Sequence, residues 1–386
     1  MNSQFDLLTE RRGTCSVKWD AADRAFGGEN LLPMWIADMD FPAAPGILDS
    51  LSRRVEQGVF GYGTLSQAYY DAVIGWMERR HHCKVERDWI VYTAGVVTAL
   101  NYAVQAATEP GDEILVPSPV YGPFYHAVED WGRVLVKCPL KNEALRYTFD
   151  FEDMERRVTP RTRALMLCSP HNPVGRVWER AELEELAAFC LRHNLSVIAD
   201  EIHNDLVFRA HTMFLNVSPE LAGRTILCTA PSKTFNLAGI QASNIIIPGE
   251  ALRQKYRAAV ARNHGSSANS FVQAAVLGAY NDSERWLDEL LEYLDGNMAL
   301  FCGTVERELP KLRVRRPEGT YMTWVDCSGL GLEPGALKRF FVDRCGLALS
   351  DGAGFGEEGA GFMRFNLACP RATVEECLRR LKENCR

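Results

Sequence analysis

The feature of this sequence that most constrains its fold is the alternation of short, wholly apolar segments with helical ones. Seven segments predict strands: residues 90–93, 114–116, 134–137, 164–168, 196–199, 225–229 and 243–247. Helical patterns fall between several of them, as at residues 98–107 and 180–193. Strands that are apolar throughout are typical of a mostly parallel sheet covered by helices on both faces. The sequence therefore predicts an α/β fold.

The pattern changes near residue 283. A long charged helix is predicted at 284–308, followed by a strand at 321–326, a helix near 335–345, a strand at 362–367 and a closing helix at 373–383. Since 386 residues exceed one ordinary core, we expect a large domain over residues 51–283 and a smaller α+β domain over 284–386. Residues 1–50 predict no fold of their own and are expected to pack on the small domain.

Composition excludes several classes of function. The net charge is −7 and no basic block occurs, which argues against a nucleic-acid partner. The uncharged residues 89–108 are interrupted by polar side chains, so a strand, turn and helix are expected there and not a membrane span. The twelve cysteines form no C-x-x-C pair and predict buried thiols, hence a reducing cytoplasm. The run HHC at 81–83 is interpreted as a surface feature, and no metal site is predicted.

Polar motifs follow the predicted strands at the ends where α/β proteins bind ligands. Gly95, in the turn TAGV, would let backbone N–H groups at a helix start approach a phosphate. Asn172, in SPHNPVG, is held extended by the following Pro173, so its amide could point into a cleft. Taken singly, the first pattern is also typical of a plain tight turn and the second of an ordinary loop.

Two further motifs add ionisable groups. In ADEIH, Asp200 could keep a ring nitrogen protonated and His203 could hydrogen-bond a phenolic oxygen, although such residues alone are more often caps. In PSKTFNLAG, Lys233 follows a buried strand, where desolvation lowers the pKa of an amine and makes it a nucleophile for a carbonyl. A phosphate cradle, an acid for a pyridine nitrogen and a Schiff-base lysine are together what a pyridoxal-phosphate (PLP) enzyme needs.

This order of motifs resembles the fold-type-I PLP superfamily, aminotransferase class I/II. Within it, the chain is most similar to the MalY/PatB-like group of cystathionine β-lyases, also called cysteine-S-conjugate β-lyases. The resemblance runs from PMWIADMDF at 33–41 to RFN at 364–366. The most subgroup-like segments are that first run, SPVY, DEIH and SKTFN.

The resemblance implies a role for each matching residue. Lys233 would form the Schiff base, and Tyr121 would stack on the pyridine ring. Tyr62 would reach the phosphate of the neighbouring subunit's cofactor, which implies a homodimer, and both tyrosines are candidates to assist a leaving sulfur. The other implied cofactor contacts are Gly95, Val96, Asn172, Asp200, His203 and Ser232. Arg364 would bind the substrate carboxylate, and the backbone of Ala37 would line the substrate side.

One departure concerns the phosphate. Many class I aminotransferases carry an arginine eight residues after the lysine, where this chain has Gln241. The resemblance then implies α,β-elimination of cystathionine or S-substituted cysteines to pyruvate, ammonia and a thiol. An aminotransferase using a 2-oxo acid and a regulatory protein that keeps the fold remain alternatives, and the preferred sulfur amino acid stays open.

Overall fold

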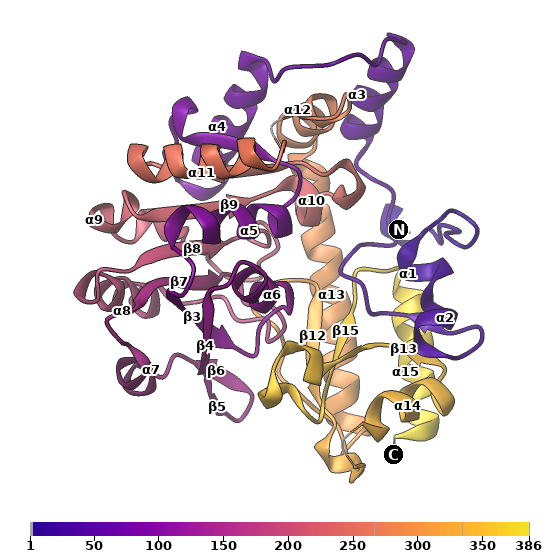
Figure 1. Ribbon diagram of the computed structural model, residues 1–386. Coiled ribbons are helices and arrows are strands. Elements are labelled where there is room, and N and C mark those ends of the chain that lie inside the picture. The colour runs from indigo at the N-terminus through magenta and orange to yellow at the C-terminus, as the bar shows by residue number, and fades with distance from the viewer. Residues whose placement is uncertain (1–2, 266, 334, 386) are drawn as a thin grey trace.

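The computed structural model describes residues 3–265, 267–333 and 335–385. Its large sheet has the order β2 (Ile90–Thr93), β10 (Ser243–Ile246), β9 (Thr225–Thr229), β8 (Ser196–Asp200), β7 (Thr162–Cys168), β3 (Glu113–Ser118) and β4 (Val134–Pro139) (Figure 1). All neighbours are parallel except β10, which runs antiparallel to both β2 and β9. The seven predicted strands are these seven, so the expected mostly parallel sheet is confirmed.

Strand residues alternate between two apolar layers. On β7, Ala164 and Met166 face a layer shared with α5 (Val96–Ala107), α6 (Pro123–Glu129) and α11 (Glu250–Arg262). Leu165 and Leu167 face the other layer, which contains α4 (Gln67–His81), α8 (Arg180–Arg192) and α12 (Val272–Asp282). Because successive strand side chains point to opposite faces, an all-apolar strand requires helices on both sides.

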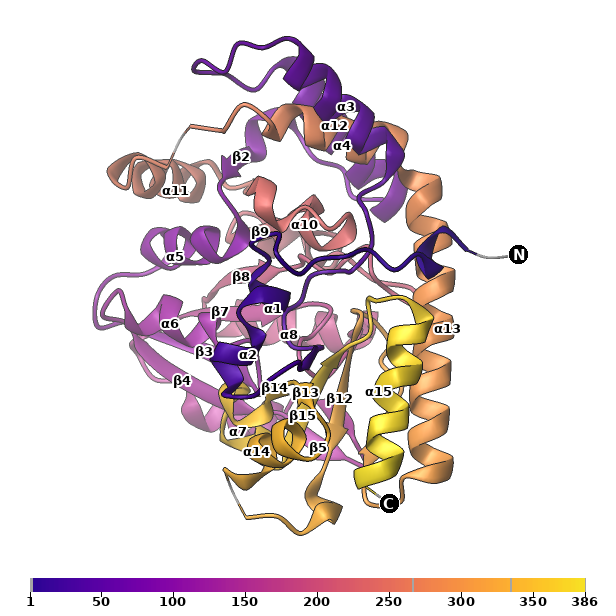
Figure 2. The same cartoon turned by 90° about the vertical axis from the view of Figure 1, so that its right-hand side faces the viewer.

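The C-terminal part forms a smaller unit around an antiparallel sheet. Its strand order is β11 (Arg313–Val314), β12 (Met322–Asp326), β15 (Phe362–Asn366) and β14 (Ser350–Asp351). The long helix α13 (Glu284–Glu308) lies beside α15 (Arg371–Asn384), and α14 (Ala336–Asp343) precedes β13 (Leu347–Ala348) (Figure 2). The predicted smaller α+β domain is thus confirmed as an architecture, while its boundaries stay a prediction.

The N-terminal segment joins this smaller unit. After α1 (Val17–Asp20) and α2 (Ala22–Phe26), the short strand β1 (Leu32–Pro33) pairs in parallel with β13. Residues 35–41, which we call the strap, then run past the large sheet towards α3 (Pro45–Glu56). The remaining elements are β5 (Lys141–Glu143), β6 (Arg146–Thr148), α7 (Phe151–Arg157), α9 (Pro219–Ala222), α10 (Pro231–Thr234) and seven short 3₁₀ turns.

The structure bears on three interpretations drawn from the sequence, which concern the cysteines, a membrane span and residues 81–83. Among the described residues every cysteine is a free thiol, and all but Cys15 are buried, as predicted. No described helix has both the length and the apolar character that crossing a membrane would require. The surface interpretation of residues 81–83 holds for His82, which is exposed, but is wrong for the other two, because the His81 ring is only 5% exposed and Cys83 is buried.

Candidate active site

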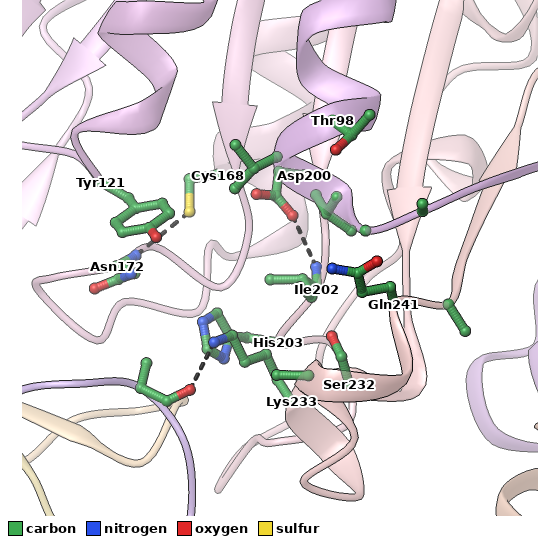
Figure 3. Close-up of a pocket in the computed structure, with 17 residues that line it drawn as sticks. Thr98, Tyr121, Cys168, Asn172, Asp200, Ile202, His203, Ser232, Lys233 and Gln241 are labelled. Carbon is green, nitrogen blue, oxygen red and sulfur yellow. Dashed lines mark hydrogen bonds between the residues drawn. The ribbon is translucent and has the colours of Figure 1, made fainter. Parts of the chain in front are cut away.

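A cavity of about 240 Å³ lies where several strands of the large sheet end. Figure 3 shows Tyr121, Asp200, His203 and Lys233 around the same space, brought together from three segments of the chain. The predicted residues that line it are Ala37, Gly95, Val96, Tyr121, Asn172, Asp200, His203, Ser232 and Lys233. A cavity of roughly 150 Å³ holds a benzene ring, so this one has room for a substituted single ring.

One end of the cavity is the start of a helix. Gly95 is the N-cap of α5, and no side chain caps the helix there. Its φ of +93° is a backbone conformation that suits glycine. The first N–H groups of an uncapped helix need an external acceptor, and the helix dipole favours an anion. Ser232 and Gln241 line the same cavity, so the Gln241 side chain brings no positive charge to it.

Lys233 enters the cavity from α10, the four-residue helix after β9. Its Nζ donates to the carbonyl oxygen of Ala37 in the strap at 2.6 Å. Burial and the charge of Arg364 lower the pKa of the lysine to about 8, against the opposing charges of Asp38 and Asp200. Near neutral pH this amine therefore exchanges protons more readily than an exposed lysine does.

Asp200 stands at the end of β8 and is 5% exposed. Burial raises the pKa of its carboxyl to about 7, although the Ile202 N–H donates to it at 3.0 Å and Lys233 also favours its charged form. A cationic partner would stabilise the ionised form of such a buried carboxyl. A protonated ring nitrogen would be such a partner.

We expect Asp200→Asn to stabilise the cofactor-free protein at pH 8. The folded pKa lies above the ordinary value of 3.8, so the ionised carboxyl weakens folding progressively as pH rises from about 4 to about 7. Urea unfolding at pH 8 should show a gain on the order of 3 kcal/mol, which shrinks towards pH 4. The exposed Asp130→Asn should show none, and equal gains for both variants would contradict this reading.

Two rings complete the cavity wall. His203 is buried, burial lowers its pKa well below the usual value, and its Nδ1 has no hydrogen-bond partner in the described structure. Tyr121 lies between β3 and α6 and is 38% exposed, and burial of its hydroxyl raises its pKa. A buried imidazole nitrogen without a partner beside a cavity is available to hydrogen-bond a bound group.

Arg364 approaches from β15 of the smaller unit. Its Nη1 donates to Asn172 Oδ1 at 3.0 Å, and its Nη2 donates to the Trp35 carbonyl at 2.8 Å and to Ser350 Oγ at 3.1 Å. Its Nε has no partner in the described structure. Burial lowers the pKa of this guanidinium to about 10. The group is therefore fixed in orientation and still has a donor for an anion.

Two predicted residues, Arg364 and Tyr62, do not line the cavity, and the structure adds others. Arg364 adjoins the cavity through its hydrogen bond to Asn172. Tyr62 is fully exposed and lies in a different surface hollow. Sequence reasoning missed Tyr321, whose hydroxyl donates to the Ala37 carbonyl at 2.9 Å, and Ser350 beside Arg364. No motif marks Tyr321 or Ser350. Tyr321 directly precedes β12, however, whose residues are all buried, so the apolar run of that strand would have placed it in a buried segment.

The donor set fits the cofactor that the resemblance implies. The uncapped helix start suits a phosphate, Asp200 suits a pyridinium nitrogen, and Lys233 suits an aldehyde carbon. The unpartnered His203 Nδ1 lies in the same cavity. The chemistry of these residues therefore matches PLP group by group.

Comparison with known proteins agrees with this geometry. Residues 38–381 match the model of the family described as aminotransferase class I and II. The chain is 44% identical to the cystathionine beta-lyase PatB of Bacillus subtilis, over 98% of each chain, and 32% identical to the protein MalY of Escherichia coli, over 96% of each. It also superposes on the PLP-bound C-S lyase of Staphylococcus hominis with a TM-score of 0.93 at 30% identity, over 100% of this chain and 98% of that one. The chain belongs to the aminotransferase class I and II family.

Proposed function

We propose that this protein is a PLP-dependent C–S β-lyase, which converts cystathionine or an S-substituted cysteine with water to pyruvate, ammonia and a thiol. The observation that carries the proposal is the 44% identity to a cystathionine beta-lyase over 98% of both chains. Lys233 and Asp200 line one cavity, and Arg364 adjoins it through its hydrogen bond to Asn172, which supports the proposal.

PLP would be held by the α5 start at Gly95 and Val96, by Ser232, and by the ring contacts Tyr121, Asn172, Asp200 and His203. When bound, it supplies an electron sink for the negative charge that develops at the substrate's Cα. Asp200, next to the ring nitrogen, would keep that nitrogen protonated. Lys233 would link the cofactor before substrate arrives.

The chain's own groups would carry the proton transfers. Arg364 would bind the substrate α-carboxylate through paired N–H donors, which fixes the direction of the Cα–H bond. The neutral amine of Lys233 would take the α-proton at Nζ. The C–S bond then breaks, its electron pair leaves with the sulfur, and a proton on Tyr121 or Tyr62 could neutralise the thiolate.

The direct test is pyruvate formation from L-cystathionine by cofactor-loaded protein without any 2-oxo acid. Pyruvate and free thiol released in equal amounts are expected. Turnover that starts only when a 2-oxo acid is added would make the protein an aminotransferase and overturn the proposal.

We also propose a homodimer whose two sites each use Tyr62 from the partner. Support comes from the exposure of Tyr62 and of the apolar Val55, Val59 and Phe60 near it, a patch that favours association. Mixing Lys233→Ala subunits with Tyr62→Ala subunits should restore activity, because each mixed dimer then holds one intact site. Each variant alone should stay impaired. No recovery on mixing would contradict a shared site.

The free, buried thiols support a location in the reducing cytoplasm. Fractionation of the source cells, with activity followed in each fraction, would check this. Activity confined to an oxidising compartment would contradict it.

A further inference from the structure

Asp205, five residues after Asp200, is a buried carboxylate outside the cavity. It is 3% exposed, and three side chains from two other segments donate to it. Trp76 Nε1 lies 3.1 Å and His81 Nε2 2.8 Å from its Oδ1, and both come from α4. Thr234 Oγ1 lies 2.7 Å from its Oδ2. Nothing in the proposed reaction uses this group.

The cluster is built to keep Asp205 ionised. Burial opposes its charge, but the charge and hydrogen bond of His81, with the hydrogen bond of Thr234, hold the pKa of Asp205 below its ordinary value. A buried carboxylate is costly to fold unless it is fully hydrogen-bonded. Its three donors meet this requirement, and the third of them, Thr234, directly follows Lys233 in the chain.

The helix that carries Lys233 cannot orient itself. Helix α10 has four residues, its N-cap Ala230 makes no side-chain cap bond, and the N–H of Phe235 closes its single turn on the Pro231 carbonyl at 2.9 Å. One turn is far below the length at which a helix is stable alone. External contacts must therefore set the direction in which the Lys233 side chain leaves the backbone.

Two such contacts lie just after the lysine in the chain. Thr234 is held by Asp205. Two residues further on, Asn236 Nδ2 donates to the Met39 and Phe41 carbonyls of the strap at 3.0 Å each. The charges that act on the Lys233 amine are those of Arg364, Asp38 and Asp200, whereas Asp205 is linked to this part of the chain through its hydrogen bond with Thr234.

We propose that Asp205 is a positioning residue for the catalytic lysine, fixing helix α10 through the Thr234 hydroxyl with Trp76 and His81 holding the carboxylate in place. This rests on the role of Lys233 in the proposed function. The buried His81 ring, which the sequence pattern assigned to the surface, thereby gains a role.

The test removes only the hydroxyl. Thr234→Val keeps the shape of a fully buried side chain but leaves Asp205 without its third donor, whereas Thr234→Ser retains the hydroxyl. Thr225→Val is the matched control. Thr225 is equally buried, at 1% exposed, and its hydroxyl donates to the Leu221 carbonyl, but it begins β9, whereas α10 follows the end of that strand. Each variant is measured for Tm, for kcat and KM, and for the pH titration of the bound cofactor's visible absorbance without substrate.

We expect Thr234→Val to lower kcat by about 10- to 100-fold, as small misplacements of reacting groups do, and to shift the absorbance titration. Thr234→Ser should recover kcat to within about threefold of wild type, a loss of roughly 0.7 kcal/mol or less. Thr225→Val should lower Tm without either effect. If Thr234→Val behaves as Thr225→Val does, Asp205 is merely structural and the proposal fails. If Thr234→Val does not fold, Thr234→Ala and Thr225→Ala replace the pair.

Failure of the proposed function would be seen separately. Wild-type protein that binds the cofactor but releases no pyruvate still gives the absorbance titration, which decides the Asp205 proposal. If the protein shows no cofactor absorbance, the pH dependence of Lys233 acylation by acetic anhydride tests the Asp205 proposal. In wild type its midpoint is expected at about 8, and an unchanged midpoint in Thr234→Val would overturn the proposal.

Discussion

Replacing Lys233 with alanine should abolish pyruvate release from L-cystathionine and lower kcat by at least about 10⁴-fold, the upper range for one acid–base group. This lysine lines the cavity with a pKa lowered to about 8, and in the proposed function Asp200 is engaged by the ring nitrogen and Arg364 by the carboxylate, so neither is free to act as the base. The cofactor's visible absorbance should also move, because no amine remains to link it. A coupled assay for pyruvate and a visible spectrum measure both effects.

The matched control is Lys255→Ala, which removes an exposed lysine from α11. Its kcat should stay within about twofold of wild type, since surface substitutions change folding by about ±0.5 kcal/mol. A Lys233→Ala protein that keeps more than a hundredth of wild-type kcat would mean that another group removes the α-proton.

Arg364→Lys should lower kcat/KM by about 10²- to 10³-fold, with a higher KM. Lysine keeps the charge but loses the planar fork that donates to Asn172, Trp35 and Ser350 together. Hydrogen bonds to a charged group contribute about 1.5–3 kcal/mol each, so losing the paired contact to a carboxylate gives a loss of this order. Initial rates over a range of cystathionine concentrations measure it.

Arg253→Lys provides the comparison, since Arg253 is also buried but donates to the Ile247 and Pro248 carbonyls away from the cavity. That variant is expected to lose stability and keep its KM. If Arg364→Lys retains the wild-type KM, a different residue binds the substrate carboxylate.

The strands of the large sheet were predictable because their signal is local. Residues 90–93 and 225–229 were bounded correctly from apolar runs alone, and β12 and β15 were placed within a residue at each end. The antiparallel β10 was predicted as a strand without a direction. Direction depends on the route of the chain between elements, which periodicity does not encode.

The candidate site was predictable for those residues that lie in recognisable sequence motifs. Lys233, Asp200 and Asn172 follow strands whose ends meet at one edge of a parallel sheet, so the topology brings them together. Contacts made by backbone carbonyls, such as that of Ala37, carry no residue signature. His81 was misassigned because its sequence neighbours are charged, whereas its acceptor, Asp205, lies 124 residues away.

The Trp35 carbonyl and Arg364 guanidinium are 329 residues apart in sequence, and their hydrogen bond has a consequence for how the protein is made. At roughly 5–20 residues per second, a ribosome adds the arginine tens of seconds after the tryptophan. Throughout that interval the Trp35 carbonyl has no partner on the smaller sheet, although Asn236 can already bind the Met39 and Phe41 carbonyls of the strap. The residues of the proposed cofactor site can come together on the ribosome, but the proposed carboxylate site is completed only when β15 has been released.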